Sequence, residues 1–158
     1  MIEFDIKISA KELYDYMLMH HYNTAGGILG SGMGAVCILV ALSTKRYIFI
    51  FLGILLLLYL PVSLYMKSRQ QALLNPAFKE PFHYTVDDTG ITISQKDVTE
   101  HQDWGRMVKA VSTQRSIIVY TSPVNATIFP KAQLGDFKGD LIGLISTHMP
   151  PKKVKIRS

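Results

Sequence analysis

Two charge-free stretches decide the fold: AGGILGSGMGAVCILVAL at residues 25–42 and YIFIFLGILLLLYLPVSLYM at residues 47–66. They contain 18 and 20 residues, and a helix that crosses a bilayer needs about 17–25. Only residues 43–46 separate them, so the two helices should be antiparallel neighbours. We therefore predict a transmembrane hairpin over residues 25–66, with spans at about 25–43 and 47–66.

A row of glycines marks one face of the first predicted span. Gly26, Gly30 and Gly34 recur at every fourth residue, and residues four apart share a helix face. Glycine at such positions lets a second helix backbone approach closely. We expect this face to pack against the second span, which the short connection places beside it. Association with another copy of the chain through the same face is the alternative.

The distribution of basic residues predicts the orientation of the hairpin. Lys and Arg near membrane spans are enriched on the cytoplasmic side. The turn between the spans carries Lys45 and Arg46. The other side carries five basic residues: Lys7, Lys11, Lys67, Arg69 and Lys79. We therefore expect both termini in the cytoplasm. Acidic rather than basic residues dominate the segment before the first run, unlike the leader of a signal peptide, so both spans should be retained.

Residues 1–24 are predicted to form a separate N-terminal strand and helix. Apolar and polar side chains alternate over residues 2–8, which is typical of a half-buried strand. Ser9 precedes Glu12 by three residues, the spacing of a helix capping box. We expect a short helix to follow and to lead into the membrane.

Residues 67–149 are predicted to form a compact polar domain. Its apolar residues first recur with a period of two between turn residues, which indicates a run of short antiparallel strands. The period becomes helical between Gly135 and His148, as expected for an amphipathic helix. We expect this helix to cover an open end of a curved sheet and to bury Trp104, in a core that folds from residues 67–151 alone.

The polar domain also carries short motifs in a definite order. They are an Asp-x-x-Gly turn at residues 87–90, a Trp with spaced apolar residues at Trp104, Met107 and Val111, the segment Ile118-Val119-Tyr120, and Phe129-Pro130-Lys131 before the last helix. Together with the strand–helix start and the two-span hairpin, this order resembles the YcxB-like family of bacterial membrane proteins.

The resemblance implies a fold and a location. It implies an α+β membrane protein of the bacterial inner membrane, in which a pleckstrin-homology-like antiparallel β-domain follows the hairpin and is closed by a C-terminal helix. Family members often have an Arg and then an aromatic residue soon after the Pro-Lys pair. This chain has Ala132 and Leu134 there, so no role of that arginine carries over. The resemblance implies no particular reaction.

Residues 150–158 form a basic tail, which accounts for most of the net charge of +5. Its basic residues are Lys152, Lys153, Lys155 and Arg157. Beside an anionic leaflet, each basic residue contributes about 1 kcal/mol of attraction. We therefore identify these four as candidate membrane-surface residues. A solubilising end is the alternative, whereas nucleic-acid binding is disfavoured because the domain has no interleaved basic and aromatic residues.

No motif in the sequence indicates catalysis, a cofactor or a metal. The single cysteine, Cys37, excludes an internal disulfide. Residues 30–35 match a dinucleotide-binding pattern but do not follow a strand, as that site requires. We therefore expect a non-enzymatic binding module without a cofactor, which recognises membrane lipid or a protein partner. The main alternative is a glycine-face oligomer that forms a pore or assists a transporter; an unrecognised enzyme is a weaker third.

Overall fold

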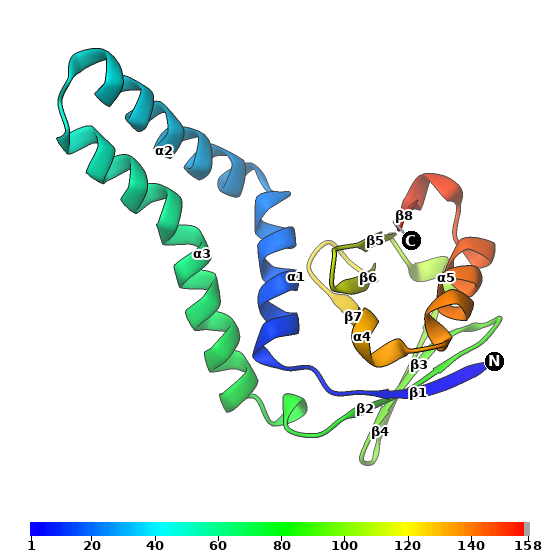
Figure 1. Cartoon of the computed structure of the whole chain (residues 1–158). Coiled ribbons are helices and arrows are strands. Elements are labelled where there is room, and N and C mark those ends of the chain that lie inside the picture. The colour runs from blue at the N-terminus through cyan, green and yellow to red at the C-terminus, as the bar shows by residue number, and fades with distance from the viewer. Residues whose placement is uncertain (157–158) are drawn as a thin grey trace.

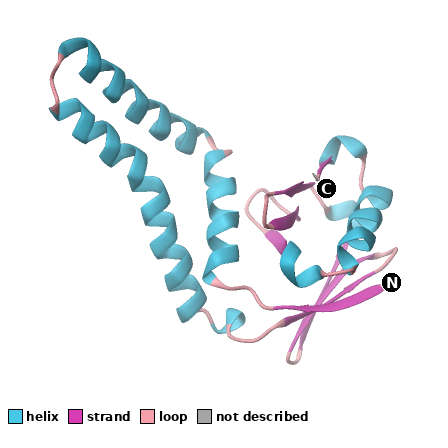
Figure 2. Cartoon of the chain, viewed as in Figure 1, coloured by secondary structure: helices cyan, strands magenta, loops and turns pink. Residues whose placement is uncertain are grey.

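The computed structural model describes residues 1–156. It is an α+β structure with two long apolar helices and a β-sheet domain that carries a C-terminal helix (Figure 1). The helices are α1 Ala10–Tyr22, α2 Ala25–Thr44, α3 Ile48–Leu74, α4 Lys131–Leu134 and α5 Phe137–His148, with short 3-10 helices η1 Pro76–Phe78, η2 Trp104–Arg106 and η3 Pro151–Lys153. The strands are β1 Ile2–Ile6, β2 Phe82–Val86, β3 Gly90–Gln95, β4 Val98–Asp103, β5 Lys109–Ser112, β6 Ser116–Tyr120, β7 Ala126–Pro130 and β8 Val154–Lys155. Figure 2 shows the strands gathered on one side of the molecule, with the α2–α3 hairpin projecting from the other.

Helices α2 and α3 form the antiparallel hairpin expected from the two charge-free runs (Figure 1). The hydroxyl oxygen of Thr24 caps α2 by accepting a hydrogen bond from the N–H of Gly27 at 3.4 Å. Lys45 ends α2 in the left-handed conformation, with a φ of 53°. Both helices are long and apolar enough to cross a membrane. α3 continues past Met66, the predicted end of the second span, to Leu74, and α3 packs against α1.

The first sheet has the order β1-β2-β3-β4 and is antiparallel throughout. β1 pairs with β2 from Ile2 opposite Val86 to Ile6 opposite Phe82. The helices α1, α2 and α3 are therefore an insertion between two neighbouring strands. The β-domain thus includes residues 2–6, which the sequence analysis placed in a separate N-terminal region. The local alternation identified the strand, but its partner lies about 80 positions later in the chain.

The second sheet has the order β7-β6-β5-β8. β6 pairs antiparallel with β5 and β7, and β8 runs parallel to β5, with Val154 opposite Ala110. Residues 151–155 are therefore tied to the domain, whereas the basic tail predicted over residues 150–158 included no strand. Apolar contacts hold this segment in place, because the side chains of Val154 and Ile156 pack against the hydrophobic core.

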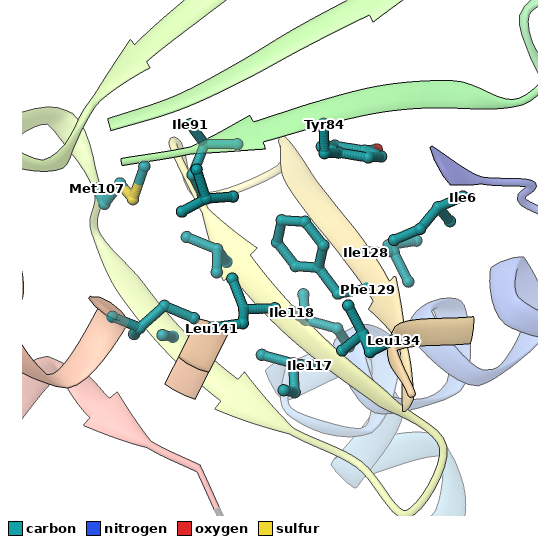
Figure 3. Close-up of a cluster of buried hydrophobic side chains, with 14 of the residues drawn as sticks. Ile6, Tyr84, Ile91, Met107, Ile117, Ile118, Ile128, Phe129, Leu134 and Leu141 are labelled. Atoms are coloured by element: carbon teal, nitrogen blue, oxygen red, sulfur yellow. The ribbon is translucent and has the colours of Figure 1, made fainter. Parts of the chain in front are cut away.

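The hydrophobic core lies between the two sheets, and β6 contributes four of its five residues to it, Ile117, Ile118, Val119 and Tyr120. The fifth, Ser116, is buried but polar. Figure 3 shows Ile117 and Ile118 of this strand beside Phe129 of β7. Of the apolar residues of the C-terminal helices, Leu134 of α4 and Leu141 and Ile145 of α5 are buried, whereas Leu144 is half-buried and Phe137 is 41% exposed.

Trp104 is buried, with 7% of its surface exposed, as the sequence analysis predicts. Its indole Nε1–H donates a hydrogen bond to the carbonyl oxygen of Asp87 at 2.9 Å. Its ring stacks on His148 near the end of α5, with ring centroids 5.5 Å apart. The residue therefore joins the β2–β3 turn to the C-terminal helix.

Candidate functional site

Gly34 and Gly53 form a close contact between the two long helices. A Cβ added at Gly34 would lie 2.8 Å from Cγ of Leu57 and 3.1 Å from the carbonyl oxygen of Gly53. A Cβ added at Gly53 would lie 2.8 Å from the carbonyl oxygen of Gly34. Gly26 and Gly30 are different, because a Cβ at either would have no atom within 4 Å. Of the three predicted glycines, only Gly34 therefore meets the second helix.

The buried face of α2 follows a seven-residue spacing rather than a four-residue one. Its buried residues are Gly27, Gly34 and Ala41. Seven residues are nearly two turns of about 3.6 residues each, so these three small residues form one stripe. This stripe was not predicted from the sequence, because the more obvious glycine spacing runs beside it. Gly53 was not predicted either, because no small residue at helical spacing marks it.

Helix α1 connects the hairpin to the β-domain by packing against both. The ring of Tyr14 meets Tyr65 of α3 edge to face, with centroids 5.7 Å apart. Toward the domain, the hydroxyl of Thr113 donates a hydrogen bond to the carboxylate of Asp15 at 2.5 Å. The hairpin and the domain are therefore joined by a packed helix.

An aromatic cluster lies where α1 meets the second sheet. The ring of His20 stacks on Tyr120 with centroids 6.1 Å apart, and Nζ of Lys109 lies 4.3 Å from the centroid of Tyr120. Desolvation, followed by the charges of His21 and Lys109, lowers the pKa of His20. Burial, with a smaller contribution from Tyr16, raises the pKa of Tyr120 to about 12. The cluster therefore favours a neutral imidazole and a neutral phenol.

A pocket of about 410 Å³ opens between α1, the first sheet and the β6–β7 turn. Leu13 and Met17 of α1 line one wall, and Phe82 and Ile93 line the sheet side. The hydroxyl of Tyr16, another lining residue, donates a hydrogen bond at 3.0 Å to a carbonyl oxygen in the β6–β7 turn. The polar lining residues are Gln71, Glu100, Gln102, Thr121, Asn125 and Thr127.

Strand β4 supplies the acidic wall of this pocket. The side-chain amide of Gln102 donates a hydrogen bond to Oε1 of Glu100 at 3.2 Å, and Thr127 donates to Oε1 of Gln102 at 3.4 Å. Among residues 1–156, no ion pair involves Glu100. The Glu100 carboxylate therefore stands at the pocket wall without a basic partner.

A second hollow of about 350 Å³ continues along the same face of the sheet. It shares Phe82, Ile93 and Glu100 with the first pocket and extends to Val98 at the far end of β4. We call the combined feature the β4 groove, defined by Phe82, Ile93, Val98, Glu100 and Gln102.

The structure places three of the four candidate membrane-surface residues. Lys152, Lys153 and Lys155 are exposed, and Nζ of Lys153 donates a hydrogen bond to the carbonyl oxygen of Met107 at 3.2 Å. Arg157 lies outside the described residues. β8 is the outer strand of the second sheet on the side of β5, whereas α1 contacts β6 and β7. The lysines therefore lie across this sheet from the helix that leads into the hairpin.

Metal-ligating side chains do not cluster in the part of the chain that the structure describes. Within residues 1–156, no group of three or more His, Cys, Asp or Glu residues could hold a metal ion. Cys37 is a free, half-buried cysteine on α2.

These features define a class of protein: a small two-sheet domain interrupted by a helical hairpin whose helices are long and apolar enough to cross a membrane. A family model described as YcxB-like protein matches residues 86–148, from the end of β2 to the end of α5. The sequence-based recognition of a YcxB-like protein is confirmed over this segment. No curated protein and no solved structure matches the chain.

Proposed function

We propose that this chain is a membrane-anchored, non-enzymatic binding module. The hairpin crosses a bacterial cell membrane twice, and the β-domain recognises a protein or lipid partner at the cytoplasmic face. The observation that supports this most strongly is the apolar, outward-facing surface of α2 and α3, joined through packed α1 to a domain with an open groove.

The exposed surface of the hairpin supports membrane insertion. Leu29 on α2 is 68% exposed and Phe51 on α3 is 69% exposed, and many other apolar side chains of these two helices are also exposed. Monomeric soluble proteins rarely expose apolar patches larger than about 300–600 Å². In a bilayer the same side chains would contact lipid tails. The apolar part of α3, residues 48–66, is about 28 Å long at 1.5 Å per residue, close to the hydrocarbon thickness of about 30 Å.

The order of the strands supports a pleckstrin-homology-like domain. Four strands form the first sheet, the next three form most of the second, and α5 follows them. The hairpin occupies the connection between β1 and β2, and β8 adds a short parallel strand. The YcxB-like match lies within this domain.

The basic residues support a cytoplasmic domain. Lys67 and Arg69 follow the apolar part of α3, on the side of the hairpin from which the β-domain continues. The turn at the other end has Lys45 and Arg46, and the excess of Lys and Arg on the domain side favours the cytoplasm.

A displacement experiment tests the proposed function. The tagged full chain is isolated from its native membrane in a mild detergent, and the retained proteins and lipids are identified by mass spectrometry. An excess of a hairpin-free chain, with residues 27–60 replaced by a short Gly-Ser loop, is then added. We expect the specific partner to be displaced. The binding-module proposal would be contradicted if residues 25–66 alone retained the partner and the hairpin-free chain did not displace it.

A membrane oligomer is the second candidate function. Gly26 and Gly30 form an open strip on α2, because a Cβ added at either residue would have no atom within 4 Å. Such a strip allows a second helix to approach closely. Gly30→Leu should reduce the oligomer size in detergent if this strip joins copies of the chain, and should leave the size unchanged otherwise.

A further inference from the structure

Strand β4 is an open edge of the first sheet. Within residues 1–156 its strand partner is β3, and five of its six residues are exposed. The opposite edge strand, β1, has α4 and α5 packed against it, and just beyond its end the N–H of Lys7 donates a hydrogen bond to Gln133 at 2.9 Å. An edge strand presents unpaired N–H and C=O groups that another strand can use. Of the two edges, β4 is therefore the one available for strand addition.

The β4 groove lies along the inner side of this open edge. Paired residues of antiparallel strands share a sheet face, so the pairing of Ile93 with Glu100 places both on the groove side. Val98 and Gln102 lie two residues to either side of Glu100 and therefore point the same way. An extended peptide rises about 3.4 Å per residue, as a β-strand does. A peptide segment of about five residues can therefore lie along residues 98–102 of β4.

The charge of the groove selects the chemistry of its occupant. Glu100 lines both hollows together with the apolar side chains of Phe82 and Ile93, and exposed Val98 lines the smaller one. A carboxylate in partly apolar surroundings is stabilised by an opposite charge nearby. The larger hollow is lined by no Lys or Arg among the described residues. Lys96 lines the smaller hollow, where its ammonium pairs with Glu80 at 3.0 Å. The larger hollow therefore lacks the cations that a phosphate-bearing lipid headgroup would need.

We propose that the β4 groove binds an extended segment of a protein partner, which adds a strand to β4 and places a basic side chain against Glu100. Apolar side chains two residues before and after the basic one enter the two hollows. This inference rests on the proposed function and specifies the partner as a peptide segment with alternating apolar, basic and apolar residues facing the groove.

Synthetic peptides test this inference on the full chain. The chain is held in nanodiscs of neutral phosphatidylcholine, and binding is measured by fluorescence anisotropy. The probes are labelled TVTKTVT and its matched partner TVTETVT, which differ only in the central charge. We expect the lysine peptide to bind at least tenfold more tightly. Equal binding of the two peptides, or no binding of either, would overturn the inference.

Charge exchange assigns the effect to Glu100. Glu100→Lys should reverse the peptide preference, and Glu100→Gln should reduce it to less than about threefold. Glu3→Lys is the matched control, since Glu3 is an exposed acid on β1, the other edge strand of the same sheet. It makes the same charge change and should keep the wild-type preference. If Glu3→Lys changed the peptide preference as much as Glu100→Lys does, the preference would come from general electrostatic attraction. That result would contradict the assignment of the binding site to Glu100.

Backbone methylation tests the added strand itself. Two versions of TVTKTVT carry N-methyl groups on alternate residues, one version on the odd positions and the other on the even positions. Because alternate N–H groups of an added strand face β4, one version should lose binding and the other should retain it. Equal affinity of both versions would overturn strand addition. If the peptides fail while the hairpin-free chain still displaces a native partner, this inference is wrong and the proposed function stands.

Discussion

The indole of Trp104 lies between the β2–β3 turn and α5, where it donates a hydrogen bond to Asp87 and stacks on His148. Trp104→Ala would remove a buried aromatic ring and leave a cavity, so we expect it to destabilise the β-domain by about 3–5 kcal/mol. Trp104→Phe keeps an apolar ring and should cost much less. Urea unfolding followed by far-UV circular dichroism measures both, and an unchanged midpoint for Trp104→Ala would contradict the packing described.

The lowered pKa of His20 gives the junction of α1 and the second sheet a pH dependence. The unfolded chain binds this proton more readily than the folded chain, so the folded state should lose stability as the pH falls through the ordinary His pKa of about 6.5. We expect the urea midpoint to fall between pH 7.5 and pH 5, and His20→Phe to reduce this fall. His101→Gln, on exposed β4, is the control. An identical pH dependence in wild type and His20→Phe would rule out His20 as its source.

At the scale of the helices, Gly34 and Gly30 form a matched pair. A side chain at Gly34 meets Leu57 and the backbone of Gly53, whereas a side chain at Gly30 meets open space. Overpacking costs typically about 1–3 kcal/mol, so Gly34→Leu should lower the thermal midpoint in detergent. Gly30→Leu should leave it unchanged. Equal midpoints for the two variants would contradict the helix contact.

The C-terminal strand should contribute to stability through its apolar side chains rather than its charges. Truncation after Pro150 removes Val154 and Ile156 from the core edge, and partial burial of two such side chains contributes about 1–2 kcal/mol. We expect a lower unfolding midpoint for the truncated chain. Replacing Lys152, Lys153 and Lys155 by Gln should change stability by less than about 0.5 kcal/mol.

Vesicle binding separately tests the candidate membrane-surface role of these lysines. The Gln variant should bind anionic vesicles more weakly than wild type if the lysines contact lipid, and added salt should weaken wild-type binding because it screens the charges. Equal binding of wild type and the Gln variant at low salt would remove that role.

The sequence predicts those elements that depend on neighbouring residues, and it does not predict features that depend on residues far away in the chain. The hairpin follows from two uninterrupted apolar runs, and the end of α2 at Thr44 lies one residue from the predicted one. β1 was predicted as a strand from its alternation, but pairing with β2 depends on contacts about 80 positions away. The short β8 was missed because the lysines around Val154 dominate its composition.

At the scale of the molecule, the candidate site was harder to predict than the fold. Glu100 and Gln102 occur in a polar stretch that resembles any solvent-facing strand. They face Leu13 and Met17 across the pocket because α1, far away in the sequence, packs against β6 and β7 of the second sheet. The β4 groove is therefore a product of the long-range arrangement around the inserted hairpin, and no local motif marks it.

Cysteine labelling in intact spheroplasts tests most directly whether the hairpin anchors a cytoplasmic domain. In a Cys37→Ala background, Thr44→Cys marks the end of α2 at the hairpin turn, Leu39→Cys marks the apolar surface, and Asp97→Cys marks the exposed β3–β4 turn. With a membrane-impermeant maleimide, we expect Thr44→Cys to be labelled at once, Leu39→Cys to stay unlabelled, and Asp97→Cys to be labelled only after permeabilisation. Labelling of Asp97→Cys in intact spheroplasts, or of Leu39→Cys as fast as Thr44→Cys, would contradict a membrane-inserted hairpin that holds the β-domain in the cytoplasm.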